Sequence, residues 1–141
     1  MHLYTIHQWL LLFYIYCFIG WIWESCFVSL KKHKWINRGF LKGPFLPIYG
    51  SGAIVVLFST LTVENNLILV FIIGMIAATI LEYITGVMME KLFHVRYWDY
   101  SEKQFNINGH ICLLSTLAWG FFSILLVRFV NPPIGNLIIY I

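Results

Sequence analysis

Four long apolar runs, separated by short polar segments, restrict this chain to few folds. The runs cover residues 8–30, 44–61, 66–89 and 111–130. Each approaches or exceeds the roughly 17–25 helical residues that cross about 30 Å of hydrocarbon. Only 11% of the residues are charged and 60% are hydrophobic, whereas about a quarter of a soluble domain is charged. We therefore predict an all-α membrane protein, with four transmembrane helices in a single integral membrane domain of residues 1–141.

The positions of the basic residues predict how these helices are oriented. Arg128 lies alone near one face, and the other eight of the nine basic residues fall in the two longer loops: Lys31, Lys32, Lys34, Arg38, Lys42, Lys91, Arg96 and Lys103. Loops rich in Lys and Arg stay in the cytoplasm. Residues 62–65 leave room only for a tight turn between the second and third runs. We expect a multi-pass protein of the cell membrane with both termini on the non-cytoplasmic side.

The C-terminal residues do not fit this scheme simply. Asn131-Pro132-Pro133 is expected to end the fourth helix, because proline removes a backbone donor and obstructs a helix interior. The segment that follows, 134–141, is too short to cross the bilayer again as a helix. It is expected to lie along the membrane interface, or to be the remainder of a longer ancestral chain.

The two halves of the sequence share a pattern that predicts a parallel duplication of a helix–loop–helix unit. In each half a loop glycine, Gly39 or Gly109, is followed eleven residues later by the glycine of an aromatic–Gly pair, Tyr49-Gly50 or Trp119-Gly120. The first helix of each half carries one glutamate, Glu24 or Glu82. Both units would start outside, so their axis would run along the membrane normal. Chance similarity between apolar helices is the alternative.

The two glutamates lie well inside the predicted spans. Glu24 is seven residues from Lys31 and Glu82 is nine from Lys91, or roughly 10 and 13 Å from the cytoplasmic ends. A carboxylate at this depth costs several kcal/mol unless it is protonated, paired or hydrated. Both side chains should therefore face the bundle interior, either in a structural bond between helices or in a ligand site.

The cytoplasmic loops carry groups that would complete a ligand site. Amides, cations and aromatic rings lead into the second and fourth spans, whose N-termini add free N–H donors. We predict a substrate-binding vestibule open to the cytoplasm and suited to a zwitterion, a cation or a polar headgroup. Its candidate residues are Glu24, Asn37, Arg38, Glu82, Trp98, Asp99, Asn106, Asn108 and His110.

Other chemistry finds little support in the sequence. The three cysteines and the His110-Ile111-Cys112 segment lack the spacing of a zinc site. No Walker A motif is present, so the chain does not hydrolyse ATP by that route. We expect no metal, no cofactor and no nucleic-acid partner, and we assign no catalytic residue.

The loop motifs carry a resemblance to a known family. They are Gly20-Trp21-Ile22-Trp23-Glu24, Asn37-Arg38-Gly39-Phe40-Leu41-Lys42-Gly43-Pro44, Leu81-Glu82-Tyr83, Trp98-Asp99-Tyr100-Ser101, Phe105-Asn106-Ile107-Asn108-Gly109 and Trp119-Gly120. Together they resemble the small bacterial membrane proteins labelled putative ABC-transporter permeases of the CmpB type. The resemblance implies a transport-type protein and would place an arginine where this chain has His110.

Three functions remain open. The first is a small transport-type protein working as a homo-oligomer or beside a separate transporter subunit such as an ATPase, because four short-looped helices enclose little volume. The second is a membrane-embedded enzyme acting on a lipid or lipid-linked headgroup, with Glu24, Glu82, Asp99 and His110 as acid–base candidates. The third is a non-catalytic scaffold or regulatory subunit, in which internal bonds would occupy the glutamates.

Overall fold

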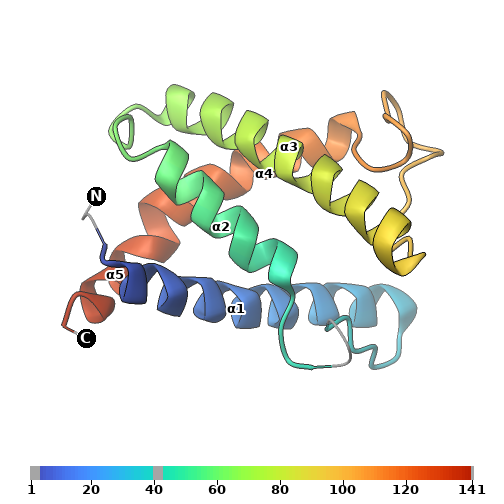
Figure 1. Cartoon of the computed structure of the whole chain (residues 1–141), viewed down its shortest axis with the longest axis horizontal. Coiled ribbons are helices and arrows are strands. Elements are labelled where there is room, and N and C mark those ends of the chain that lie inside the picture. Colours follow the sequence, from blue (N-terminus) through green and yellow to red (C-terminus); the bar gives the residue numbers. More distant parts are fainter. Residues whose placement is uncertain (1–3, 40–42, 141) are drawn as a thin grey trace. The chain divides into compact units, whose positions relative to one another are not determined.

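The computed structural model describes residues 4–39 and 43–140, and its regular structure is helical (Figure 1). The elements are α1 (Ile6–Lys32), α2 (Pro47–Ser59), α3 (Leu67–Phe93), α4 (Leu113–Leu125), the π-helical turn η2 (Leu126–Val130) and α5 (Asn131–Ile138). Within those two ranges the only β pairing is an isolated bridge between Ile107 and Ile111. The predicted all-α class is confirmed. Phe40, Leu41 and Lys42 of the first loop motif lie outside the described residues.

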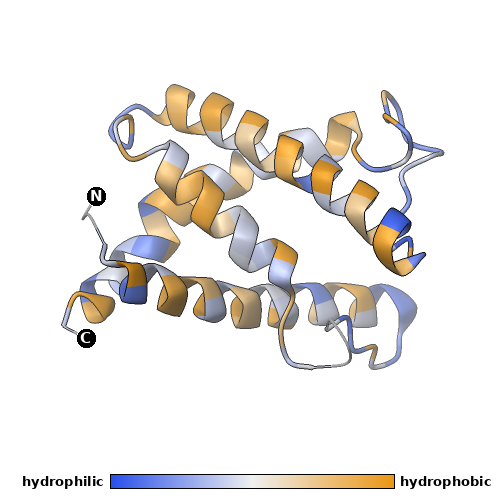
Figure 2. Ribbon diagram, viewed as in Figure 1, coloured by the Kyte–Doolittle hydropathy of each residue, from blue (hydrophilic) through white to orange (hydrophobic). Residues whose placement is uncertain are grey.

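Three helical segments are long and apolar enough to cross a membrane. They are Ile6–Lys32, Leu67–Phe93 and the continuous run Leu113–Ile138. Figure 2 shows hydrophobic residues along these helices and hydrophilic residues in the loops that join them. The long helices begin at side-chain caps, which satisfy backbone N–H groups that have no partner within the helix. Thr5 caps α1, Asn66 caps α3 and Cys112 caps α4.

Helix α2 is shorter than the predicted run 44–61. It covers 13 residues, or about 20 Å, and begins at Pro47 instead of Pro44. A residue that precedes proline is disfavoured in helical conformation, so Pro44 and Pro47 together keep residues 43–46 out of the helix. The Leu46 N–H instead donates to the Cys17 carbonyl of α1 at 3.1 Å.

The helix that starts at Leu113 does not end at Asn131-Pro132-Pro133, contrary to the expectation from the sequence. It continues through η2 into α5 and ends at Ile138. In η2 the backbone widens, and the Asn131 N–H donates to the carbonyl of Leu126, five residues back. A π turn moves the preceding carbonyls away from the proline rings, which relieves the clash that stops an ordinary α-helix.

The chain divides into two compact units. We call Val55–Pro133 the α3–α4 unit, and we call the described residues of His2–Ile54 and Ile134–Ile141 the α1 unit. In the α3–α4 unit, α3 buries a stripe at four-residue spacing that is made mostly of small residues: Val70, Gly74, Ala78, Glu82 and Gly86. Ser123 of α4 packs on Gly74, and the Thr79 hydroxyl donates to the Thr116 hydroxyl at 3.3 Å. Small residues allow such close helix packing in membranes.

In the α1 unit, α1 buries residues at the same positions relative to its glutamate. Leu12, Tyr16 and Gly20 lie twelve, eight and four residues before Glu24, as Val70, Gly74 and Ala78 do before Glu82. At the C-terminal end of the chain, Ile138 is buried, and its carbonyl accepts from the Gln8 side chain at 3.5 Å.

Two contacts recur in the two units with identical sequence offsets. In the first contact, Gly50 packs on Phe13 and Gly120 packs on Phe71. Each glycine lies eleven residues after the loop glycine of its unit, and each phenylalanine lies eleven residues before the glutamate. The residue after the glutamate also accepts from the residue before the loop glycine. Ser25 accepts from the Arg38 N–H at 3.1 Å, and Tyr83 accepts from the Asn108 side chain at 2.9 Å. These matched offsets favour the duplication, which stays a prediction.

Candidate functional site

Glu82 is a buried acidic side chain on the inner stripe of α3. It is 7% exposed, although it lies in one of the most apolar segments of the chain. The Tyr100 hydroxyl, from the loop between α3 and α4, donates to Glu82 Oε2 at 3.4 Å. The loop therefore reaches a carboxylate that lies inside an apolar helix.

Arg96 organises the start of this loop. Its guanidinium forms ion pairs with Glu90 at 2.9 Å and Asp99 at 3.1 Å, and it donates to the Asn108 carbonyl at 3.1 Å. Asp99 Oδ1 also accepts from the Ser101 N–H at 2.9 Å. The hydrogen bonds from Ser101, aided by Arg96, lower the pKa of the Asp99 carboxyl below its ordinary value. The ion pairs of Arg96 with Glu90 and Asp99 therefore stabilise one folded conformation of the loop.

His110 is buried at the end of the loop, against α3. Its Nε2 lies 3.5 Å from Glu90 Oε2, and its ring meets Tyr83 edge-on with centroids 5.6 Å apart. The Trp98 indole N–H donates to the His110 carbonyl at 2.8 Å. An ideal Cβ atom built on Gly86 would lie 2.6 Å from His110 Nδ1, so the missing side chain makes room for the imidazole.

The two loop asparagines bond to the protein itself. Asn106 donates to the Ser101 and Lys103 carbonyls at 3.2 and 3.0 Å, and it accepts from the Gly109 N–H at 3.1 Å. Asn108 has φ +54° and donates to the Tyr83 hydroxyl. Like Trp98 and Asp99, these side chains shape the loop that covers Glu82.

Sequence reasoning missed three participants in this arrangement: Tyr83, Arg96 and Tyr100. Tyr83 could have been found as a polar neighbour of an intramembrane glutamate, at the position that Ser25 holds after Glu24. Tyr100 belongs to the Trp98-Asp99-Tyr100-Ser101 motif, but its contact with Glu82 spans a separation of 18 residues. Arg96 was counted only for its charge.

Glu24 has a corresponding environment in the α1 unit. It is half-buried and interacts electrostatically with Arg38. The loop after α1 folds back along the helix, because the Arg38 N–H donates to Ser25 and because Asn37 Oδ1 accepts from the Trp21 indole at 2.7 Å. Asn37 Oδ1 also accepts from the Gly39 N–H at 2.8 Å. A cation thus lies near this carboxylate, and Asn37 holds the loop that carries the cation.

The nine predicted site residues fall into two groups, one in each unit. The α3–α4 unit brings together Glu82, Trp98, Asp99, Asn106, Asn108 and His110, and the α1 unit brings together Glu24, Asn37 and Arg38. A single vestibule that contains both groups stays a prediction. Among the residues that the structure describes, no three His, Cys, Asp or Glu side chains lie where they could hold a metal ion.

A family model described as "Putative ABC-transporter type IV", of the CmpB type, matches residues 11–141. The chain belongs to this family. The resemblance found from the loop motifs is therefore confirmed. No curated protein and no solved structure matches the chain.

Membership in the type IV ABC-transporter family agrees with the helices. The match covers Leu67–Phe93 and Leu113–Ile138 completely and α1 from residue 11 onward. The protein is accordingly a multi-pass membrane protein of transport type. The matched range also contains both glutamates and all nine predicted site residues.

Proposed function

We propose that this member of the type IV ABC-transporter family binds a polar ligand at Glu82 and Glu24, from the cytoplasmic side of the membrane. The observation that carries the proposal is the buried Glu82 carboxylate, which lies on a tightly packed stripe of α3 and is contacted by a hydroxyl from a loop. Intramembrane carboxylates are costly and in most cases mark ligand or ion pathways.

The chemistry around the glutamates favours a ligand with a cationic or hydrogen-bond-donating group. Glu82 and Tyr100 offer acceptor oxygens, and Tyr100 can also donate. In the α1 unit, Glu24 offers a carboxylate for a cationic group, and Arg38 near it offers a donor for an anionic group. A zwitterion or a polar headgroup carries both kinds of group.

The loop between α3 and α4 supplies a cover for the Glu82 site. Internal bonds from Arg96 and Asn106 keep it folded as one piece, and the Tyr100 hydroxyl contacts the glutamate at 3.4 Å. Arg96 and Asn108 also bond to Glu90 and Tyr83 of α3, so the loop keeps its place beside the carboxylate.

The proposed site faces the cytoplasm because both longer loops hold nearly all the basic residues. Four helices of which one is short enclose little space, so a complete pathway requires a second copy or a separate transporter subunit. The bilayer itself is the remaining partner.

The test is ligand capture from native membranes. The full chain, extracted in native-lipid particles, is analysed by mass spectrometry for bound metabolites, lipids and proteins. We expect a polar metabolite or headgroup enriched with the wild-type chain and lost by at least tenfold in Glu82→Gln and Glu24→Gln. Glu102→Gln removes the same charge from an exposed loop position and serves as the matched control.

The outcomes separate the three functions. A ligand retained by both folded glutamine variants would show that the proposed site is wrong. Conversion of a bound lipid during incubation would point to the enzyme. Capture of a protein partner alone, unaffected by either variant, would point to the scaffold.

A further inference from the structure

The loop that follows α1 differs from the loop that follows α3 in its charge balance. Residues 90–103 hold three basic side chains, Lys91, Arg96 and Lys103, and three acidic ones, Glu90, Asp99 and Glu102. No aspartate or glutamate occurs anywhere in residues 25–63, which include Lys31, Lys32, Lys34, Arg38 and Lys42. Within the described residues, no ion pair joins Lys31, Lys32 or Lys34 to a carboxylate.

Hydrogen bonds fix the backbone at the end of α1, where Lys31, Lys32 and Lys34 lie. His33 ends α1 in the left-handed region with φ 57°, and the Lys34 N–H donates to the Ser29 carbonyl at 3.2 Å. The Ser29 hydroxyl accepts from the Ile36 N–H at 2.8 Å and donates to the Ile36 carbonyl at 3.2 Å. These bonds fix the loop against the last turns of α1, so the cations are held together at the helix end.

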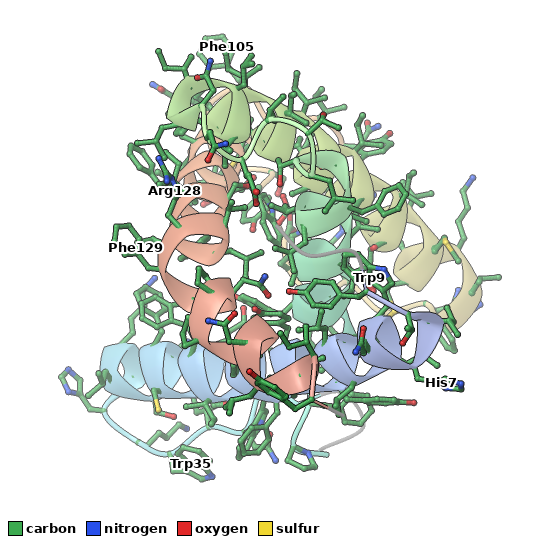
Figure 3. All side chains as sticks on the ribbon, turned by 90° about the vertical axis from the view of Figure 1, so that its left-hand side faces the viewer. His7, Trp9, Trp35, Phe105, Arg128 and Phe129 are labelled. Atoms are coloured by element: carbon green, nitrogen blue, oxygen red, sulfur yellow. The ribbon has the colours of Figure 1, made fainter. Side chains whose placement is uncertain are left out.

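An exposed tryptophan lies among these lysines. Trp35 is 65% exposed and projects away from the loop in Figure 3, and its ring meets Trp21 edge-on with centroids 6.4 Å apart. Tryptophan side chains are enriched at the headgroup level of a bilayer, because the ring is amphipathic and that level is apolar on one side and hydrated on the other. Cations stabilise the C-terminus of a helix, which explains Lys31 and Lys32 in the last turn of α1. It does not explain Lys34 and Trp35, which lie beyond the end of the helix.

We propose that Lys31, Lys32, Lys34 and Trp35 form a binding surface for the phosphate headgroups of anionic phospholipids. The lysines lie at the end of a membrane-spanning helix and form no ion pair with a carboxylate among residues 4–39 and 43–140, while the bilayer that surrounds α1 presents phosphates at that level. Basic residues next to a membrane are attracted to anionic lipid surfaces, and the attraction adds with each lysine. The inference requires that α1 spans the membrane but does not depend on either glutamate.

Titration of the detergent-solubilised full chain with lipid, followed by native mass spectrometry, tests this proposal. Phosphatidylglycerol is expected to bind at least tenfold more tightly than phosphatidylcholine. The variant Lys31→Gln/Lys32→Gln/Lys34→Gln should lose most of that difference, and Trp35→Ala should weaken binding more than Trp35→Phe. Lys91→Gln/Lys103→Gln/Arg128→Gln removes the same net charge from exposed positions elsewhere and should keep the preference.

Several results would overturn the proposal. One is a lysine variant, folded as judged by its thermal unfolding, that binds phosphatidylglycerol like the wild type. Equal weakening by the control variant would show a general effect of net charge. Inorganic phosphate that displaces the lipid at equal concentration would indicate a site for a soluble anion, and loss of only a captured acidic protein would indicate a protein-binding surface.

Discussion

His110 lies against Gly86 with its ring in the space that a side chain at position 86 would occupy. An ideal Cβ on Gly86 would come within 2.6 Å of His110 Nδ1 and 3.2 Å of His110 Cβ. The imidazole is also held by Tyr83 and by the Trp98 bond to its own carbonyl, so it has little freedom to withdraw. This contact fixes the distance between α3 and the loop that covers Glu82.

Replacing Gly86 should therefore separate the loop from α3. We expect Gly86→Val to lower the free energy of unfolding by about 1–3 kcal/mol, the usual cost of an overpacked contact. Thermal unfolding in detergent measures this, and hydrogen exchange should show faster exchange in residues 98–110. Ile84→Val, at a position that is 49% exposed on the same helix, is the control. Equal effects of the two variants would contradict the prediction.

The paired glycines of the two units should respond differently to alanine. At Gly50 the obstructing atoms include the Phe13 backbone carbonyl at 2.6 Å, whereas at Gly120 they belong to the Phe71 ring at 2.6–2.8 Å. A ring can rotate away more easily than a backbone can move. Gly50→Ala should therefore lower the free energy of unfolding by about 2–3 kcal/mol, and Gly120→Ala should lower it by about 1 kcal/mol. Phe71→Leu should rescue Gly120→Ala but not Gly50→Ala, as a double-mutant cycle of unfolding would measure.

The helices were predictable from the sequence because long apolar runs and helix caps act locally. The two errors at helix ends came from prolines. Pro47 after Leu46 shortened α2, and the π turn let the helix pass Pro132 and Pro133. Composition does not reveal whether a proline starts a helix, ends it or is accommodated, because the answer depends on hydrogen bonds such as Leu46 to Cys17.

The burial of Glu82 was predictable from the sequence, but the bonds of the loop residues around it were not. The depth of Glu82 in an apolar run indicated burial, and the structure shows it. Asn106 and Asn108, which are predicted to bind ligand, form bonds to the loop and to Tyr83 that the sequence did not predict. Long-range partners of this kind depend on the folded path of the loop, which polar residue types alone do not specify.

The loop between α3 and α4 should loosen in acid. The pKa of Asp99 is lowered in the folded chain, so its contribution to stability is fully present above the ordinary carboxyl pKa. That contribution is lost as the pH falls through the lower folded value, in the range below about pH 4. Hydrogen exchange at Ser101 and Gly109 should accelerate there, relative to helix amides. Asp99→Asn should exchange faster at neutral pH and lose this response; an unchanged response would assign it to Glu90 or Glu102.

The bond between Tyr100 and Glu82 should couple these two residues energetically. Tyr100→Phe removes only the hydroxyl, and we expect a loss of about 0.5–1.5 kcal/mol. In a double-mutant cycle with Glu82→Gln, part of that loss should disappear, because the glutamine variant lacks the charged acceptor. Tyr140→Phe removes the same hydroxyl from a position that is 86% exposed and is the control. Strictly additive effects of Tyr100→Phe and Glu82→Gln would show that the 3.4 Å contact contributes nothing.

The predicted topology depends on whether the short helix α2 crosses the membrane. Its 13 residues span about 20 Å, and residues 44–46 before it can add up to about 10 Å, enough together for the hydrocarbon. Non-helical backbone at that depth is tolerated where it bonds to protein, as Leu46 does to Cys17. If the segment crosses, Lys34→Cys and Lys103→Cys will react with an impermeant maleimide from the same, cytoplasmic side. Glu64→Cys will react from the other side. If it re-enters instead, positions 34 and 64 will share one side and position 103 will lie opposite, so three labelling reactions decide between four crossings and three.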